Sequence, residues 1–434
     1  MRQALINVQI YDFETYISKG YVVFEDKILS VGPMDEFIDR GYVVIDGEGR
    51  LVMPGLVCGH THIYSAFARG LSVPFNPKNF QDILDQLWWK LDRHLDNEAS
   101  YYSGLVAASD FLQGGVTSII DHHASGKQIT GSLDSVRRGL DEVGLRGAFA
   151  FEVSDRFPTN EAIKENRIFI DAHRTGTARG LFGLHASMSL SDRTLAKVKQ
   201  KLGADPIHVH VAESELDQTD CLKRYGKRVV ERFDDFGLIN PDSLLVHAIH
   251  VDDHELDLIK LRKATIAVNV SSNLNNGVGL PDVLKMLEKD IPVILGNDGM
   301  TYGMAHEYVT VNLAMHHRYG GHRNFGLKHL WRLIDDTYRY ASRLFDIKLG
   351  RIKPGYEADL VMVPYVAPTP MTSDNAFGHL VFGLFDHFKP QNVFVAGVPR
   401  LRDYRLVATT IESKFTQARQ VAARLWKNIQ SEDK

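Results

Sequence analysis

Cysteine is scarce in this sequence: its 434 residues include only two, Cys58 and Cys221. So few thiols exclude a cysteine-rich zinc cluster, a CxxC redox pair and a disulfide framework, and they agree with a reducing cytosol. Imidazole is plentiful by contrast, because the chain has 19 histidines. We therefore expect any metal chemistry in this protein to be carried mainly by histidine.

Long apolar runs and blocks of one charge are also missing. No run approaches the ~20 apolar residues that a membrane helix requires, and the first residues lack the apolar core and cleavage site of a signal peptide. The 50 Lys and Arg nearly balance the 54 Asp and Glu. This balance gives no electrostatic reason to expect nucleic acid or an anionic membrane as a partner. We expect a cytoplasmic protein.

Strand and helix patterns alternate through the middle of the chain. From Leu51 onward, short apolar runs are each followed by a helix-length amphipathic segment, such as 80–95, 132–143 or 216–236. The runs end near His62, Asp121, Glu152, His185, His210, His247, Ser271 and Asp298. Eight strand-then-helix units in about 250 residues predict an α/β fold built on a (β/α)₈ TIM barrel.

The two ends of the chain have a different pattern, with short strands that follow one another closely. Short strands are expected at 4–10, 21–25, 28–31 and 42–45 before the barrel, and at 358–363, 392–395 and 405–409 after it. Neither end has enough strands for a core of its own. We therefore expect 1–53 and 355–434 to form one small β-sandwich domain, with 54–354 as the barrel. The amphipathic segment 414–430 predicts a C-terminal helix that docks on its own domain.

Histidines and one aspartate stand where the barrel strands are expected to end, which is where this architecture places catalytic groups. His60 and His62 close the first strand, and because strand side chains alternate, both project from one face. In the fifth strand His210 lies nearer the mouth than His208, which is either a hydrogen-bonded core residue or a support behind the site. His247 closes the sixth strand.

The eighth strand is apolar and ends in Asp298. A carboxylate in such a place must be paired, hydrogen-bonded or bound to a metal, because burial of a lone carboxylate is prohibitive. Three imidazoles and one carboxylate, with a position left for water, suit one borderline divalent ion such as Zn²⁺ or Fe²⁺. Such an ion lowers the pKa of bound water to about 7.

These motifs resemble those of a known family. His60-Thr61-His62, the run 210–213, His247 and Asn297-Asp298-Gly299 are similar to the amidohydrolase superfamily, in its branch of cytosine deaminases, guanine deaminases and chlorohydrolases. Residues 350–361 are similar to that family's return from barrel to β-sandwich. The segments 87–93, 121–125 and 272–276 look like the SsnA aminohydrolases.

The resemblance implies a role for each residue. His60, His62, His210 and Asp298 would bind one metal ion, with Asp298 also sharing in proton transfer. Glu213 would carry a proton from water to the departing amine, and His247 would polarise the substrate or hold the water. All six of these residues are present, which argues against a binding protein on a decayed barrel.

The implied activity is hydrolysis of a carbon–nitrogen bond other than a peptide bond. We expect a deaminase that releases ammonia from an aminated purine, pterin or pyrimidine-like heterocycle. The alternative is a cyclic-amide hydrolase or a chlorohydrolase-type enzyme that uses the same metal site. Relatives of this kind are commonly homo-oligomers, and a dimer is expected by resemblance.

Departures from the family pattern leave the heterocycle open. Where many relatives have a glutamine soon after the HxH motif, this chain has 63–65, Ile-Tyr-Ser, and 185–188 reads His-Ala-Ser-Met in place of His-Ala-Pro-Tyr. We expect substrate contacts from among His185, His123, Trp89, Arg69 and Asn273, with Trp88 as the neighbouring aromatic. Each also has an ordinary structural explanation: a hydrogen-bonded histidine, a core aromatic or a surface salt bridge. His316, His317 and His322 are expected to be solvated.

Overall fold

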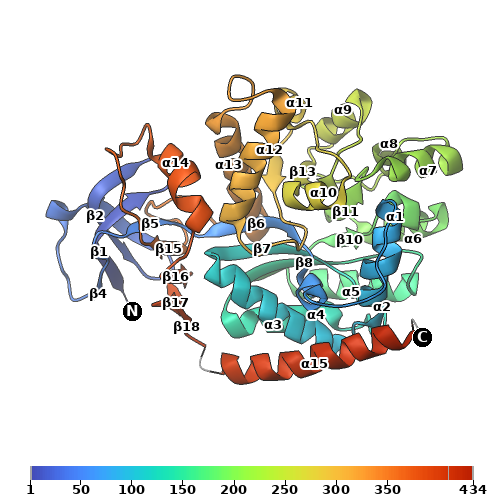
Figure 1. Ribbon diagram of the computed structural model, residues 1–434, viewed down its shortest axis with the longest axis horizontal. Coiled ribbons are helices and arrows are strands. Elements are labelled where there is room, and N and C mark those ends of the chain that lie inside the picture. Colours follow the sequence, from blue (N-terminus) through green and yellow to red (C-terminus); the bar gives the residue numbers. More distant parts are fainter. Residues whose placement is uncertain (1, 409, 433–434) are drawn as a thin grey trace.

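The structure is a computed structural model that describes residues 2–408 and 410–432. Figure 1 shows a small sheet at the left, built from both ends of the chain, beside a barrel surrounded by helices. The barrel strands are β6 (Leu56–Thr61), β7 (Val116–His123), β8 (Arg146–Phe151), β9 (Ala178–Gly180), β10 (Phe182–Leu184), β11 (Ile207–Val211), β12 (Leu244–His247), β13 (Thr265–Val268) and β14 (Val293–Leu295). Short β9 and β10 together fill the fourth position, and paired neighbours run parallel. The TIM barrel predicted from the sequence is confirmed.

The ladder is interrupted at two seams, and backbone contacts close both. At one seam Val153 forms a parallel bridge with Leu184. At the other, the backbone N–H groups of Asn297 and Asp298 donate to the carbonyl of His60 at 2.9 and 3.2 Å. The first and last strands are therefore tied together by residues of the predicted metal site, so the closed barrel itself sets their spacing.

Helices surround the barrel in the expected order. They are α1 (Phe80–Ile83), the π-helical η3 (Leu84–Trp88), α2 (Trp89–His94), α3 (Asn97–Gln113), α4 (Ser132–Val143), α5 (Thr159–Ala172), α6 (Asp192–Leu202), α7 (Glu215–Tyr225), α8 (Val229–Asp235), α9 (Asp253–Leu261), α10 (Val270–Asn276), α11 (Val283–Glu288), α12 (Met304–Tyr319) and α13 (Leu327–Phe345). The segment 216–236 forms two helices, because Gly226 ends α7 in the left-handed region at φ +68°. The predicted end of the seventh strand at Ser271 is wrong. Ser271 lies inside α10, where its backbone N–H is bound by the Glu307 carboxylate at 3.1 Å.

The small domain is one nine-stranded sheet. It contains β1 (Gln3–Tyr11), β2 (Tyr16–Phe24), β3 (Ile28–Pro33), β4 (Val43–Asp46), β5 (Leu51–Pro54), β15 (Leu360–Val363), β16 (Asn392–Val395), β17 (Val398–Arg402) and β18 (Arg405–Leu406). Three strands separate β2 from β16 in the ladder. The rings of Phe24 on β2 and Phe394 on β16 are nevertheless only 5.3 Å apart. The sheet therefore folds over on itself around a core of its own, as a sandwich does. The predicted strand 405–409 is shorter here, and Thr409 lies outside the described residues.

The C-terminal helix α15 (Ile411–Glu432) packs on the barrel rather than in the small domain. Figure 1 shows it running beneath α3 and α2, and its buried face consists of Ile411, Ala418, Val421, Leu425 and Ile429. Trp426 donates its indole N–H to the carbonyl of Phe67 at 2.7 Å, close behind the HxH strand. The assignment of this helix to the domain of 355–434 is therefore corrected: an apolar helix face shows that a helix docks, without showing on which surface. The segment α14 (Ala376–His379), η5 (Leu380–Leu384) and η6 (Phe385–His387) was not predicted.

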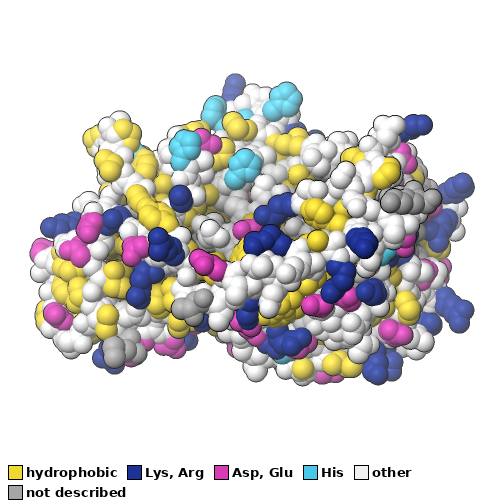
Figure 2. Space-filling view, turned by 60° about the horizontal axis from the view of Figure 1, so that its bottom comes forward, with side chains coloured by type: hydrophobic (Ala, Val, Ile, Leu, Met, Phe, Trp, Pro, Cys, Tyr) yellow, Lys and Arg dark blue, Asp and Glu magenta, His cyan; other side chains and the backbone are white. Residues whose placement is uncertain are grey.

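Charged side chains of both signs are interspersed on the face shown in Figure 2. Within the described ranges, no helix is both long and apolar enough to pass through a bilayer.

Candidate active site

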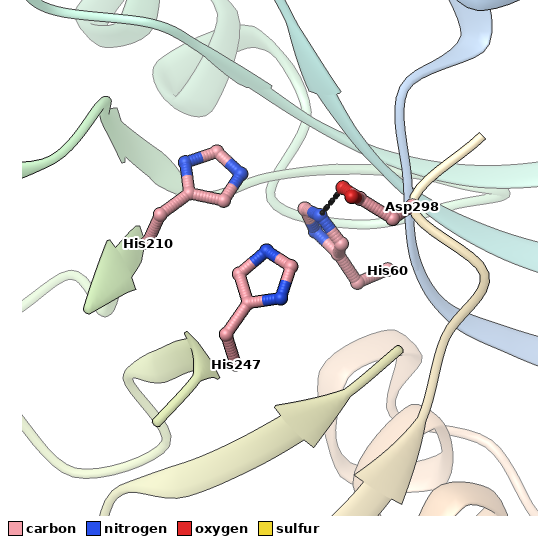
Figure 3. A group of neighbouring side chains, drawn as sticks. All are labelled: His60, His210, His247 and Asp298. Atoms are coloured by element: carbon pink, nitrogen blue, oxygen red, sulfur yellow. Dashed lines mark hydrogen bonds and ion pairs between the residues drawn. The ribbon is translucent and has the colours of Figure 1, made fainter. Parts of the chain in front are cut away.

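The predicted metal ligands meet at the mouth of the barrel. His60 and His62 come from the end of β6, His210 from β11, His247 from the last position of β12, and Asp298 from the loop after β14. The rings of His60 and His62 lie 5.0 Å apart, as expected for two residues on one strand face. Figure 3 shows His60, His210, His247 and Asp298 pointing toward one another from separate elements.

In two of these imidazoles, a hydrogen bond to a backbone carbonyl places a proton on Nδ1. His62 donates Nδ1–H to the carbonyl of His122 at 2.7 Å, and His210 donates Nδ1–H to the carbonyl of His185 at 2.9 Å. When both rings are neutral, the two Nε2 atoms carry lone pairs, and these face each other at 3.1 Å. Asp298 Oδ1 also lies 3.1 Å from His62 Nε2. Three electron-rich atoms converge, an arrangement that a shared cation stabilises.

His60 completes this cluster. Its Nε2 lies 3.0 Å from Asp298 Oδ1, and its Nδ1 lies 2.8 Å from Nε2 of His208. Ser272 donates to the other carboxylate oxygen of Asp298 at 2.6 Å. His208 is therefore neither a ligand nor an isolated core residue: it contacts His60 from behind and orients that ring, the support role that ligating histidines usually require.

The donor set fits a borderline divalent metal ion. Two groups of described residues have ligand atoms that all lie within 4.8 Å of one another: His60, His210, His247 and Asp298, and His62, His122 and His210. Burial lowers the pKa of His60 to about 4 and holds that of His210 well below its usual range. Burial opposes ionisation of Asp298, but hydrogen bonds with His60 and His62 hold its pKa well below its usual range. Neutral imidazoles and an ionised carboxylate are the forms that bind metal.

Glu213 and His247 lie beside the predicted metal ligands. Glu213 Oε2 lies 3.5 Å from His247 Nε2, while His247 donates Nδ1–H to Asn273 Oδ1 at 2.9 Å. Burial and the charge of Asp298 raise the pKa of Glu213 well above its usual range. Ala212, His247 and Asp298 have φ values of 48°, 71° and 56°, in the left-handed region. Such backbone strain is typical of functional sites.

A cavity opens above this cluster, with an empty volume of about 840 Å³ that includes the part open to solvent. Its apolar walls come mainly from Tyr64, Phe80, Leu84, Trp88, Trp89, Met188 and Met300. Its polar lining comes from His62, Asp92, Glu152, His185, His210, Glu213, Ser214, Asp217, Ser272, Asn276 and Asp298. Aromatic walls around a few polar groups suit a planar organic molecule.

Two of the five predicted substrate contacts line this cavity, and three do not. His185 and Trp89 do, together with Trp88. His123 is fully buried with its Nε2 3.2 Å from the hydroxyl of Ser100. Arg69 binds Asp110 at 2.6 Å. Asn273 supports His247.

The three residues that do not line the cavity all contact other side chains of the protein instead. Side chains of neighbouring positions on a strand point to opposite faces, so a position close to the site does not show that its side chain enters the cavity. Asp92 and Glu152, which line the cavity, received no role from the sequence. Glu152 stands at a predicted strand end, so its position was a usable signal. Asp92 lies on α2, where nothing in the sequence distinguishes it from a solvated charge.

Known proteins resemble this chain along nearly its whole length. It is 28% identical over 429 residues to the 5'-deoxyadenosine deaminase of Methanosarcina mazei, covering 96% of this chain and 95% of that protein. It is 28% identical over 393 residues to the 5-methylthioadenosine/S-adenosylhomocysteine deaminase of Syntrophomonas wolfei, covering 84% of this chain and 85% of that one.

Solved structures share the fold. An adenosine deaminase from Xanthomonas campestris with bound zinc superimposes with a TM-score of 0.85 at 20% identity, covering 98% of each chain. An atrazine chlorohydrolase from Arthrobacter aurescens complexed with zinc reaches 0.80 at 19% identity, covering 97% of this chain and 100% of that one. The sequence model of the amidohydrolase family matches residues 51–399. Together with the barrel and its histidine cluster, this match shows that the chain belongs to the amidohydrolase family.

Proposed function

We propose that this protein is a hydrolytic deaminase that uses one divalent metal ion, Zn²⁺ or Fe²⁺, to release ammonia from an aminated heterocycle. The observation that carries the proposal is the convergence of lone pairs from His62, His210 and Asp298 beside a non-ligating carboxylate, Glu213. Hydrolytic removal of an amine needs a water made nucleophilic and a group that moves its proton.

His60, His62, His210 and Asp298 would hold the ion. An ion bound there supplies Lewis acidity and a lowered pKa for the attacking water. The protein's own part is to keep these side chains in place and in the right protonation state. His208 and Ser272 do so for His60 and Asp298 through hydrogen bonds of 2.8 and 2.6 Å.

Glu213 and His247 would handle the proton and the substrate. Glu213 lies near the predicted metal ligands but outside the hydrogen-bond network that joins them. Its carboxylate can therefore take a proton from water and return it to the departing amine. Burial raises its pKa, which favours uptake of the proton from water. Asn273 fixes the ring of His247 with Nε2 toward Glu213, where it can hold the water or the reacting ring atom. Asp298 shares in the same transfer.

The substrate class rests on the cavity and on the relatives. Aromatic side chains at positions 80, 88 and 89 suit a planar ring. Relatives named as deaminases of adenosine-type compounds favour a purine over a pterin or pyrimidine. A cyclic-amide hydrolase or a chlorohydrolase remains the alternative, since an atrazine chlorohydrolase shares the fold.

The test combines elemental analysis of the purified protein with ammonia release from purines, pterins and pyrimidines. We expect about one Zn²⁺ or Fe²⁺ per chain and stoichiometric ammonia with at least one purine. Removal of the metal by a chelator should abolish turnover, and Zn²⁺ or Fe²⁺ should restore it. Consumption of a heterocycle without ammonia would overturn the deaminase proposal and favour the alternative. A cytoplasmic location and a homodimer, suggested by low cysteine content and by resemblance, belong to the same proposal.

A further inference from the structure

One side of the cavity presents hydrogen-bond acceptors in a buried setting. We call Asp92, Glu152 and His185 the acceptor wall. They come from α2, from the residue after β8 and from the residue after β10. Glu152 is only 3% exposed and His185 only 9%, yet all three residues line the cavity. The proposed deaminase chemistry gives none of these side chains a role in proton transfer.

Arg156 holds the two carboxylates but does not satisfy them fully. Its Nη2 donates to Asp92 Oδ2 at 2.7 Å and to Glu152 Oε1 at 2.6 Å, and its Nη1 lies 3.3 Å from Asp92 Oδ1. Glu152 Oε2 accepts no hydrogen bond from the described residues. One guanidinium shared by two carboxylates also leaves this side of the cavity with a net negative charge.

His185 adds a second, independent acceptor. When the hydroxyl of Ser189 donates to the carbonyl of Ala186 at 3.1 Å, it accepts the Nδ1–H of His185, 2.6 Å away. The lone pair of a neutral His185 is then on Nε2, which has no hydrogen-bond partner in the described part of the chain. His185 lines the cavity, where a ligand can supply the donor that Nε2 lacks.

An aromatic ring lies beside the acceptor wall. Trp89 stacks on the guanidinium of Arg156 at 4.5 Å, and its ring centroid is 6.0 Å from that of His185. The residues that line the cavity include five carboxylates, at positions 92, 152, 213, 217 and 298, and no Lys or Arg. A planar ring is therefore favoured here, and apart from the proposed metal ion a bound anion would find no cation among the side chains that line the cavity.

We propose that the acceptor wall is a subsite that binds paired N–H or O–H donors of the heterocyclic substrate and rejects anionic substrates. This inference rests on the proposed function, because it requires a heterocycle in the cavity. The donors have two sources of the same chemistry. They are the vicinal hydroxyls of a nucleoside sugar, or the amino and imino groups on the edge of a free base.

The decisive variant is Glu152→Gln, which keeps the size of the side chain and an oxygen for Arg156 but replaces the free acceptor by an amide. Glu165→Gln is the matched control. Glu165 is a buried barrel carboxylate that accepts from the backbone N–H groups of Gly131 and Leu133 at 2.8 and 3.1 Å, away from the cavity. Thermal unfolding of both variants reports any general loss of stability.

Substrate pairs then identify the donor. Adenosine is compared with 2',3'-dideoxyadenosine, 2,6-diaminopurine with adenine, and adenosine with its 5'-monophosphate. We expect Glu152→Gln to lower kcat/KM about 10- to 100-fold for the member of one pair that carries the additional donors, and to leave the analogue that lacks them nearly unchanged. The wild-type enzyme should prefer the neutral nucleoside over the monophosphate by about 100-fold or more. The pair whose kcat/KM ratio changes shows whether the acceptor wall binds sugar hydroxyls or base N–H groups.

Measurements of binding without turnover distinguish a failure of this inference from a failure of the proposed function. Trp88 and Trp89 line the cavity, so quenching of tryptophan fluorescence follows the same compounds without turnover. Donor-selective weakening by Glu152→Gln without ammonia release would support the subsite and count against the deaminase. Equal losses for both members of each pair, losses matched by Glu165→Gln, or tight binding of the monophosphate would overturn the subsite, whether or not ammonia is released.

Discussion

Glu213 and Asp298 are both carboxylates at the barrel mouth, but their surroundings separate their roles. Asp298 lies within 3.1 Å of ring nitrogens of His60 and His62, which stabilise its ionised form. Glu213 has His247 at 3.5 Å and the side chain of Asn276 beside it, and burial favours its protonated form. Two groups with opposite preferences are what a metal ligand and a proton carrier require.

Glu213→Gln should retain the metal and lose most turnover. The amide has the same shape but cannot carry a proton, so we expect kcat to fall by about 10²- to 10⁴-fold. Ammonia release and metal analysis on the same preparation check this. Loss of the metal would instead make Glu213 a ligand.

Asp298→Ala should weaken metal binding and activity together, because it removes the negative charge that lies between the imidazoles of His60 and His62. Titration with a competing chelator measures the affinity, and we expect a loss of about 10-fold or more. Ser271→Ala is a suitable comparison, because that hydroxyl binds Glu307 rather than the metal cluster. An unchanged metal content in Asp298→Ala would contradict the ligand role.

Local sequence determines the bounds of some secondary-structure elements, whereas a tertiary contact determines those of others. Helix α4 begins and ends at the residues that periodicity predicted, because Gly144 ends it in the left-handed region at φ +83°. The predicted strand runs on from Val268 to Ser271, but Glu307, 36 residues from Ser271, binds the start of α10 and stabilises a helix there. Contacts of that sequence separation have no local signal.

Helix α15 offers a test at this scale. Leu425 is buried against the barrel, so Leu425→Ala should cost about 2 to 5 kcal/mol and lower the unfolding temperature. Lys427→Ala, an exposed position on the same helix, should change stability by less than about 0.5 kcal/mol. Calorimetry of both variants makes the comparison, and equal unfolding temperatures would show that α15 does not stabilise the barrel.

In the whole molecule, a buried ion pair joins the barrel to the small domain. Arg146, the first residue of β8, donates to Asp359 beside β15 at 2.6 Å, and the two residues are 3% and 4% exposed. Ser118 also accepts from Arg146, and the backbone N–H of Ala396 donates to Asp359 at 2.8 Å. The pair therefore links strands of both parts.

Removal of one partner should destabilise the whole chain. Asp359→Ala leaves a buried guanidinium without its main counter-charge, and we expect a loss of about 3 to 5 kcal/mol. The unfolding temperature should fall by several degrees, while Asp386→Ala, at a carboxylate whose side chain is 70% exposed, should leave it unchanged. An unaltered midpoint in Asp359→Ala would indicate that the two parts are held by apolar packing alone.

The sequence by itself determined the barrel and the group of residues at its mouth. Both depend on local rules: strand alternation places His60 and His62 on one face, and parallel strands bring their ends together. Only the tertiary structure decided which side chains line the cavity. Asp92, Glu152 and His185 lie on separate elements, and their shared position depends on how α2 packs across the barrel mouth. The position of α15 was likewise decided by the tertiary structure. Its apolar face shows that the helix is buried on one side, but not which surface covers that side.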